Sequence, residues 1–275
     1  MITSKTNSKV RYARSLHRRS VRYRERRFVV EGVRLIEEMI EAGHEPALFF
    51  CTEDSSSNPR ARALVEALTS SSAEVVGVSE DVMRFMADTK TPQGVLAVVP
   101  FPDLVTEGAH LILVLDGLRD PGNLGTILRS AEAAGVGQVI TMRGSVDVFG
   151  PKVVRGGMGA HFHLPIRADC SWMDVRGVLR GRQVVVADPR GEKSYDEVDW
   201  SRPSALIVGG EARGATAEAR QMCEGTVSIP MRAGIESLNV AVATSIILFE
   251  AARQLRVVGR KAEGREGTPS ADSAK

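Results

Sequence analysis

One short segment constrains the fold of this chain more than any other. Residues 111–115 are Leu-Ile-Leu-Val-Leu, a run with no polar face to turn toward solvent. Such a run is typical of a strand in a parallel sheet that helices cover on both faces. Parallel strands need long crossover connections, usually helices, so the rest of the chain should alternate between strands and helices.

The expected alternation is present on both sides of this segment. Short apolar segments bounded by turn residues predict strands at residues 28–31, 48–51, 75–78, 95–99, 111–115, 138–142, 163–166, 184–187, 205–208 and 227–229. Helical spacing of apolar residues, with cap and stop signals, predicts helices at residues 9–19, 32–42, 59–68, 81–87, 124–134, 153–159, 173–179, 216–223 and 238–255. The fold class is therefore α/β with a mostly parallel sheet.

Prolines and a glycine divide the alternating pattern into two domains. Pro100, Pro102 and Gly108 interrupt it, which predicts a linker. We expect one domain at residues 1–104 and a second at residues 105–258. Residues 259–275 carry no apolar period, so we expect a disordered tail there.

Composition excludes several classes of protein. With 43% hydrophobic and 25% charged residues in 275, the chain can bury a core and is neither disordered, collagen-like nor a coiled-coil rod. It has no apolar run of the ~18 residues that span a bilayer, and its N-terminus lacks the apolar core of a signal peptide. Cys51, Cys170 and Cys223 are too few and too scattered for a disulfide framework or a zinc site. We expect a cytoplasmic protein with reduced thiols and no membrane partner.

Positive charge is concentrated at the N-terminus. The net charge is +2, but residues 1–27 carry ten basic residues and one acid, and arginine dominates. Arginine forks suit phosphate groups, and Tyr12, His17 and Tyr23 stand among them where they could stack on unpaired bases. We predict an RNA-binding arm made of Lys9, Arg11, Arg14, Arg18, Arg19 and Arg22. The alternative is a solvated terminal arm without a ligand. Deleting residues 1–27 should weaken RNA binding and its salt dependence if the arm contacts phosphates.

Ligands in open α/β sheets bind beyond the carboxyl ends of the strands, and three such ends carry unusual loops. The first follows residues 111–115 and contains Asn123 and Arg129. Each has an ordinary explanation, since Asn123 could cap a helix and Arg129 could be a solvated helix charge. The spacing of six residues would allow both to face one side of that helix.

The other two loops follow the strands predicted at residues 205–208 and 227–229. The first begins Gly209-Gly-Glu211, where the glycines would let a ligand approach the backbone closely. The second contains Ser237, which we expect to cap the last helix, and Asn239, which has no evident packing role. The helix that follows is apolar nearly all round, so it should be buried or lie at an interface.

Several common sites are not supported. No G-x-G-x-x-G follows a strand and no P-loop lysine motif is present, so a nicotinamide oxidoreductase is a distant alternative. His161 and His163 have the spacing of a metal pair on a strand. They have no carboxylate or thiol ligand near them in the sequence, so we interpret them as ordinary strand histidines and expect no metal.

Taken together, the sequences of the three loops are specific enough to indicate a protein family. They are DGLRDPGNLGTILRSA at residues 116–131, GGEARG at residues 209–214 and IPMRAGIESLNVAVA at residues 229–243. In order and spacing they resemble the three motifs of SpoU (TrmH-type) RNA 2′-O-ribose methyltransferases of the SPOUT superfamily. Residues 9–19, 28–32 and 91–94 resemble the ribosomal-protein-like substrate-binding domain of the branch of this family that acts on rRNA.

The resemblance implies a bound S-adenosylmethionine, held in a deep trefoil knot at the carboxyl end of the sheet. It implies backbone contacts to this cofactor from Gly209, Ile229 and Leu238. It also implies a homodimer in which one protomer serves the site of the other. The polar active-site positions that match the family are Asn123, Arg129, Glu211, Ser237 and Asn239.

The implied activity is methyl transfer to a ribose 2′-hydroxyl of RNA, with large-subunit rRNA preferred because of the N-terminal domain. We expect Arg129 to bind the target phosphate and stabilise the 2′-oxygen, since guanidinium is too basic to act as a base. The alternatives are methylation of tRNA, a resistance methylase acting on rRNA, and a non-catalytic RNA-binding assembly factor. The sequence does not specify which nucleotide is modified.

Overall fold

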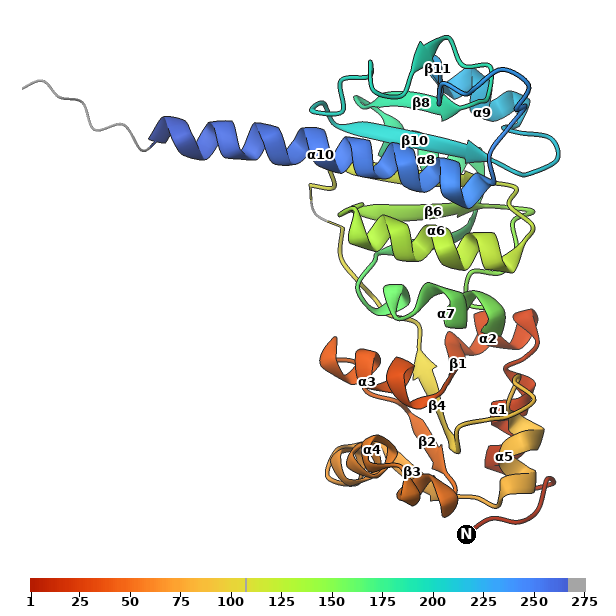
Figure 1. The fold of residues 1–275 in the computed structure, drawn as a ribbon. Coiled ribbons are helices and arrows are strands. Elements are labelled where there is room, and N and C mark those ends of the chain that lie inside the picture. Colours follow the sequence, from red (N-terminus) through yellow and green to blue (C-terminus); the bar gives the residue numbers. More distant parts are fainter. Residues whose placement is uncertain (107, 267–275) are drawn as a thin grey trace, which may run out of the picture.

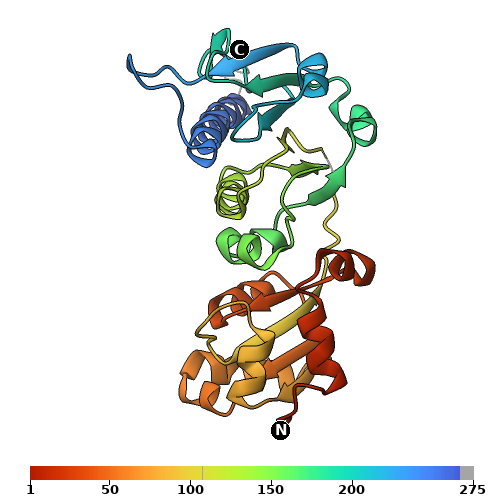
Figure 2. The ribbon, with the colours of Figure 1, turned by 90° about the vertical axis from the view of Figure 1, so that its right-hand side faces the viewer.

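The computed structural model describes residues 1–106 and 108–266. These residues form two lobes stacked end to end, each built on its own sheet (Figures 1 and 2). We call residues 1–100 the N-terminal lobe and residues 111–266 the C-terminal lobe. Among the described residues, no helix has the length and apolar character needed to cross a bilayer.

The N-terminal lobe contains a mixed four-stranded sheet in the order β1-β4-β2-β3. Its strands are β1 (Arg27–Glu31), β2 (Leu48–Cys51), β3 (Glu74–Gly77) and β4 (Val95–Pro100). β4 runs antiparallel to both of its neighbours, whereas β2 and β3 are parallel. Around the sheet lie α1 (Ser8–Ser15), α2 (Arg19–Glu25), α3 (Val33–Glu41), the 3₁₀ turn η1 (Asp54–Ser57), α4 (Pro59–Thr69) and α5 (Glu80–Met86).

Local chemistry explains where these helices lie. Helix α3 buries Val33, Ile36 and Met39, which share one face at helical spacing. Helix α4 begins with Pro59 in its first turn, and the side chain of Asn58 caps it by accepting from the amides of Arg60 and Ala61.

The C-terminal lobe contains a seven-stranded parallel sheet in the order β7-β6-β5-β10-β8-β11-β9. The strands are β5 (Leu111–Asp116), β6 (Gln138–Met142), β7 (Ile166–Cys170), β8 (Gln183–Ala187), β9 (Lys193–Ser194), β10 (Ser204–Gly209) and β11 (Gly225–Ser228). Every residue of β5 is buried, which confirms the expectation from its apolar run. The helices are α6 (Pro121–Ala133), α7 (Pro151–Gly157), the 3₁₀ turn η2 (Ala160–Phe162), α8 (Trp172–Leu179), α9 (Ala217–Met222) and α10 (Val240–Glu266).

Three predicted elements differ from the structure. The helix expected at residues 9–19 is divided into α1 and α2, because the chain turns at residues 16–18. The strand expected at residues 163–166 begins only at Ile166, after the η2 turn. Helix α10 continues to Glu266, so the prediction of a disordered tail is wrong for residues 259–266. Alanine, lysine, arginine and glutamate favour helix without any apolar period. Residues 267–275 of that prediction lie outside the described residues.

The two lobes share a packed junction. Helix α7 of the C-terminal lobe packs against β1 of the N-terminal lobe, as Figure 1 shows. Aromatic rings fill the space between them, and the rings of Phe101 and Phe149 stack with centroids 3.8 Å apart. Helix α7 is in turn pressed against α6, since a Cβ atom on Gly125 would lie 2.8 Å from the Cα atom of Gly156. The approach requires glycine at position 125, and a Cβ atom on Gly156 would be tight at 3.3 Å from the Cα atom of Gly125.

Candidate active site

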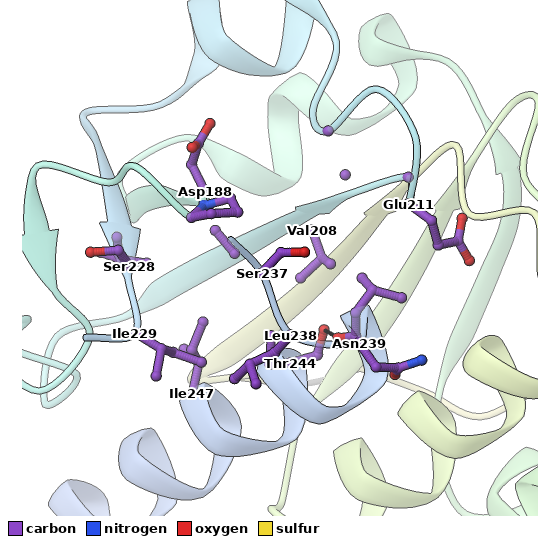
Figure 3. A pocket seen from close by; sticks show the side chains of 18 of the residues that line it. Asp188, Val208, Glu211, Ser228, Ile229, Ser237, Leu238, Asn239, Thr244 and Ile247 are labelled. Atoms are coloured by element: carbon purple, nitrogen blue, oxygen red, sulfur yellow. Dashed lines mark hydrogen bonds between the residues drawn. The ribbon is translucent and has the colours of Figure 1, made fainter. Parts of the chain in front are cut away.

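An open cavity of about 360 Å³ lies beyond the carboxyl ends of β8, β10 and β11. Figure 3 shows that its wall comes from the loops after these strands and from the start of α10. Its apolar lining includes Val208, Ile229, Leu238 and Ile247, and its polar lining includes Asp188, Ser228, Ser237 and Thr244. The volume and the mixture of apolar wall with a few polar groups are those of a small-molecule site.

Two glycines shape the loop after β10. A Cβ atom on Gly209 would lie 2.0 Å from the amide nitrogen of Ala215, and one on Gly210 would lie 2.5 Å from the carbonyl oxygen of Gly117. These neighbours are backbone atoms, so no side chain could move aside to make room. Gly209, the residue predicted to contact a cofactor through its backbone, lies on the wall of the cavity.

A chain of side-chain hydrogen bonds joins the three sequence motifs beside the cavity. The side-chain nitrogen of Asn239 donates to Oδ1 of Asn123 over 3.0 Å. The side-chain nitrogen of Asn123 donates to Oε1 of Glu211, also over 3.0 Å. The Glu211 carboxylate accepts further from the backbone amides of Arg119 and Asp120. Three segments far apart in the sequence are thus fixed to one another.

The protonation state of Glu211 determines which groups donate and which accept in this series of hydrogen bonds. Partial burial of the carboxyl raises its pKa, but hydrogen bonds from Asn123 and from backbone amides outweigh the burial, so the pKa is lowered overall. An ionised carboxylate only accepts hydrogen bonds. The amide nitrogen of Asn123 must therefore face Glu211, and its oxygen must face Asn239.

The prediction that Ser237 caps the last helix is wrong. The cap is Asn239, whose Oδ1 accepts from the backbone amides of Ala241 and Val242 at 2.9 and 3.3 Å. Asn239 thus has a structural role that the sequence did not reveal, in addition to its link to Asn123. Ser237 lies instead on the cavity wall.

The structure does not bring Arg129 to this cavity. Its side chain is exposed on α6 and is not among the residues that line the cavity. It donates no hydrogen bond to the residues described here. Among the predicted active-site residues, Arg129 is therefore the one that lies away from the cavity of its own chain.

Asp188 is a cavity residue that the sequence analysis missed. It follows β8, and its Oδ2 accepts from Nη2 of Arg220 over 2.5 Å. The hydrogen bond from Arg220 and one from the amide of Arg190 lower its pKa, so it is ionised at neutral pH. Its position directly after a buried parallel strand was the signal that could have found it.

The predicted RNA-binding arm is partly accessible. Lys9 is half-buried and forms an ion pair with Glu74, while Arg19 donates to Asp169 over 2.8 Å. Three further arginines of the arm are exposed: Arg11, Arg14 and Arg18. Arg14 also donates to the carbonyl oxygen of Ala87 over 3.3 Å.

The prediction for Arg22 is wrong. Its side chain is buried at the junction of the lobes, forms an ion pair with Asp147 and donates to the carbonyl oxygen of Leu16. A charge run in a sequence does not reveal an acid 125 residues away that pairs with one of its members.

The aromatic residues of the arm are also engaged within the protein. The Tyr23 hydroxyl donates to Asp147 over 3.1 Å, and a ring nitrogen of His17 is 2.7 Å from the carbonyl oxygen of Met86. Tyr12 is half-buried, and its hydroxyl accepts from Arg27. These side chains are built into the N-terminal lobe and its junction, not held free for stacking on bases.

The two histidines considered as a metal pair point to different partners. His161 is buried, with Nε2 2.8 Å from the carbonyl oxygen of Val148, whereas His163 lies 3.1 Å from Oε1 of Glu38. Within residues 1–106 and 108–266, no three histidine, cysteine or acidic side chains are grouped in a way that could hold a metal ion.

Family models match both lobes. Residues 110–249 match the SpoU rRNA Methylase family, and residues 7–97 match the MRM3-like substrate binding domain. The chain belongs to the SpoU rRNA methylase family. Its motif loops are those that surround the cavity and share the Asn239–Asn123–Glu211 hydrogen bonds.

Curated relatives in the SpoU family align over most of the chain. The mouse protein named rRNA methyltransferase 3, mitochondrial, is 33% identical, with 87% of this chain and 70% of that protein covered. The Bacillus subtilis protein named 23S rRNA (guanosine(2553)-2′-O)-methyltransferase RlmP is 31% identical, with 90% of this chain and 97% of that protein covered.

Solved structures show the same arrangement of both lobes. The methyltransferase AviRb from Streptomyces viridochromogenes, solved with AdoMet, has a TM-score of 0.83 and 30% identity, covering 91% of this chain and 98% of its own. An AdoMet-bound rRNA methyltransferase from Sinorhizobium meliloti has a TM-score of 0.79 and 30% identity, covering 92% of this chain and 97% of its own. A structure described for 2-OH methylation of C/U34 on tRNA covers only 54% of this chain, with a TM-score of 0.50.

Proposed function

We propose that this protein transfers a methyl group from S-adenosylmethionine to a ribose 2′-hydroxyl of ribosomal RNA. The observation that carries the proposal is the chain of hydrogen bonds from Asn239 through Asn123 to Glu211 beside the cavity. It joins the three motifs that define the SpoU family, and relatives in that family are named as rRNA 2′-O-methyltransferases and solved with AdoMet.

The residues at the cavity fit this cofactor. Gly209 presents bare backbone, and Ile229 and Leu238 add apolar wall together with backbone groups for its polar atoms. Asp188 adds to the cavity wall a carboxylate that can accept a hydrogen bond from an amino group, beside its ion pair with Arg220. When bound, S-adenosylmethionine supplies an electrophilic methyl group on a sulfonium.

The polar residues would orient the ribose and stabilise charge. Asn123, held between Glu211 and Asn239, has a fixed orientation, and Ser237 offers a hydroxyl on the wall of the cavity. Such fixed groups lower the barrier by holding the reacting hydroxyl in line with its target. Arg129 would bind the phosphate beside the target ribose and stabilise negative charge that develops on the 2′-oxygen. A guanidinium group does not act as a general base in water, so another group accepts the hydroxyl proton.

We also infer that the enzyme works as a homodimer through α10. This helix exposes Val242, Phe249 and Val257, which recur at helical spacing and form an apolar stripe. Arg129 lies on α6, which packs beside α10, and it does not line the cavity of its own chain. We propose that in this dimer Arg129 of one protomer serves the cavity of the other. Light scattering at micromolar concentration tests this: we expect a dimer that Phe249→Asp converts to monomers, and a monomeric wild-type protein would refute it.

Ribosomal RNA is favoured over transfer RNA as the substrate. The relatives named for rRNA align with both lobes, whereas the structure described for tRNA matches about half of the chain. We assign residues 1–104 to RNA binding, with the exposed basic residues of α1 and its surroundings, and residues 105–258 to methyl transfer. The three unpaired cysteines support a cytoplasmic location.

We further propose that the backbone of the C-terminal lobe forms a trefoil knot. After β11, which lies two positions beyond β10, the chain returns past the loops after β8 and β10 to place α10 against α6. Threading of this return segment through those loops would tie the knot. A crystal structure traced without a break from β5 to α10 tests it, because a backbone that straightens when its ends are pulled apart is not knotted.

Transfer of radiolabelled methyl groups tests the activity directly. The purified protein should label unmodified large-subunit rRNA, and the labelled position should resist alkaline cleavage because its 2′-hydroxyl is blocked. Small-subunit rRNA and bulk tRNA serve as comparison substrates, and stronger labelling of tRNA would refute the assignment to rRNA. Binding of S-adenosylmethionine with no transfer to any RNA would refute the proposed activity.

A further inference from the structure

A second cavity of about 620 Å³ lies in the N-terminal lobe, away from the methyl-transfer site. It is enclosed by the start of α3, the η1 turn with the start of α4, the first residue of α5 and the segment that leads into β4. None of the predicted arm residues lines it. The lining residues that matter for the argument are Arg34, Thr52, Asn58, Glu80, Gln93 and Gly94.

Two hydrogen-bonding atoms of this lining are buried and unpartnered. They are Oγ1 of Thr52, a residue only 5% exposed, and Oε1 of Glu80. Folded proteins leave few such atoms unsatisfied, so each one needs an explanation such as a missing ligand. A Cβ atom on Gly94 would lie 2.6 Å from the Thr52 hydroxyl oxygen, so only glycine fits beside that hydroxyl.

The outer part of the lining offers hydrogen-bond donors, in contrast to the buried acceptors. The Asn58 side-chain oxygen is occupied in capping α4, and the Gln93 side-chain oxygen accepts from the amide of Val33 over 2.9 Å. Their amide nitrogens are left as donors without partners among the described residues. Arg34 is exposed and forms no ion pair within that part of the chain. The cavity thus has acceptors at buried positions. Its exposed lining holds these donors and Arg34, together with the Asp54 carboxylate and Arg60, which pairs with Glu37.

We propose that this cavity binds one unpaired guanine nucleotide of the RNA substrate, at a point distinct from the ribose that is methylated. The choice of RNA as the ligand rests on the proposed function. The matched family model adds weight, since it describes the lobe as a substrate binding domain. The base would enter with its donor edge toward Glu80 and Thr52, and Arg34 would contact its phosphate or stack on its plane.

Guanine is the base whose edge matches the buried acceptors. Its N1–H and N2–H₂ groups are adjacent donors, so a carboxylate can accept from both at once. Adenine and cytosine each offer one amino group on that edge, next to a ring acceptor that would face the carboxylate unfavourably. Uracil has a single N–H between two carbonyl oxygens. Glu80 therefore discriminates among the four bases by its two oxygens.

Binding of short RNAs to the full-length protein tests the proposal. The probes are fluorescein-labelled uridine nonamers with a single guanine, adenine or cytosine in the middle, compared with uridine alone. We expect guanine to bind at least about tenfold more tightly than the others, the scale of one good two-point base contact. Glu80→Gln should remove this preference, because its amide group would face the guanine donors, and Thr52→Val should reduce it. Glu66→Gln makes the same charge change on an exposed position of α4 and should leave the preference intact.

Methyl transfer measured on the same preparations separates the two proposals. We expect Glu80→Gln to raise the KM for rRNA while the affinity for S-adenosylmethionine is unchanged. A wild-type enzyme that methylates rRNA but shows no guanine preference would overturn this inference alone, as would a Glu80→Gln variant that keeps the preference. A guanine preference that depends on Glu80, without methyl transfer to any RNA, would support the cavity assignment and overturn the proposed activity.

Discussion

Replacing Arg22 with alanine should destabilise the protein far more than replacing another arginine of the same charged segment. The side chains of Arg22 and Asp147 are 5% and 10% exposed, and the two residues form an ion pair across the junction of the lobes. Removing one partner of a buried pair leaves an uncompensated charge, which costs about 3–5 kcal/mol. The Asp147 carboxylate would keep only its hydrogen bonds from Tyr23 and from the amide of Phe149.

Arg19 is the matched control for this measurement. It also pairs across the lobes, with Asp169, but the two side chains are 43% and 46% exposed. Solvent screens such a pair, so Arg19→Ala should cost at most about 1 kcal/mol. The contrast between the two variants isolates burial, since both remove one arginine and one ion pair between the same lobes.

Urea unfolding followed by two probes provides the assay. Far-ultraviolet circular dichroism reports on both lobes, whereas tryptophan fluorescence reports on the C-terminal lobe, where Trp172 and Trp200 lie. The two probes also reveal whether the lobes unfold together, as a free energy of unfolding requires. Equal losses for Arg22→Ala and Arg19→Ala, or a loss below about 1 kcal/mol for Arg22→Ala, would refute the argument from burial.

Three further predictions concern the site and the junction. Arg129→Ala should lower kcat for methyl transfer by about 10²–10³ while calorimetry finds unchanged affinity for S-adenosylmethionine; restoration by Arg129→Lys would contradict a role that needs the planar guanidinium. Gly209→Ala should abolish cofactor binding because its Cβ would meet backbone, whereas Gly225→Ala, with open space around it, should not. Burial lowers the pKa of His161 to about 4 from 6.5, so the histidine is neutral in the folded protein at pH values where the unfolded chain takes up a proton. Stability should therefore be independent of this group above pH 6.5 and should fall by about 3 kcal/mol as pH drops from 6.5 to 4; urea unfolding of His161→Gln should show a flatter pH profile.

The sequence predicted those features that depend on short-range pattern. The apolar run at residues 111–115 predicted the fully buried β5, and the place of the motif loops after parallel strands predicted that they meet at one ligand site, which is lined by the Gly209, Ile229 and Leu238 that the family resemblance implied. Both follow from local rules, since burial on two faces removes polar residues and parallel strands end at a common edge of the sheet. Homology to the SpoU family supplied the chemistry that no periodicity contains.

Features that depend on distant partners were missed. Arg22 looked like its exposed neighbours because Asp147 is far away in the sequence, and Asn239 gave no sign that it caps α10 while holding Asn123. Asp188 was overlooked because a lone acid after a strand is common, and its place beside Gly209 appears only in three dimensions. The second cavity was invisible for the same reason, since Thr52 and Glu80 belong to different elements.

The close crossing of α6 and α7 at Gly125 and Gly156 helps to fix the distance between the two lobes, and this distance bears on which ribose is methylated. Helix α7 contacts the N-terminal lobe through β1, and α6 carries Asn123, so the two lobes are held at a set spacing and do not pivot freely about the chain between them. With RNA bound to the N-terminal lobe, as proposed above, we expect the enzyme to select the ribose to be modified by its distance from the RNA element that this lobe holds. Lengthening the RNA between those two points by one nucleotide should then move the methyl group to the neighbouring ribose, with no change in any protein residue.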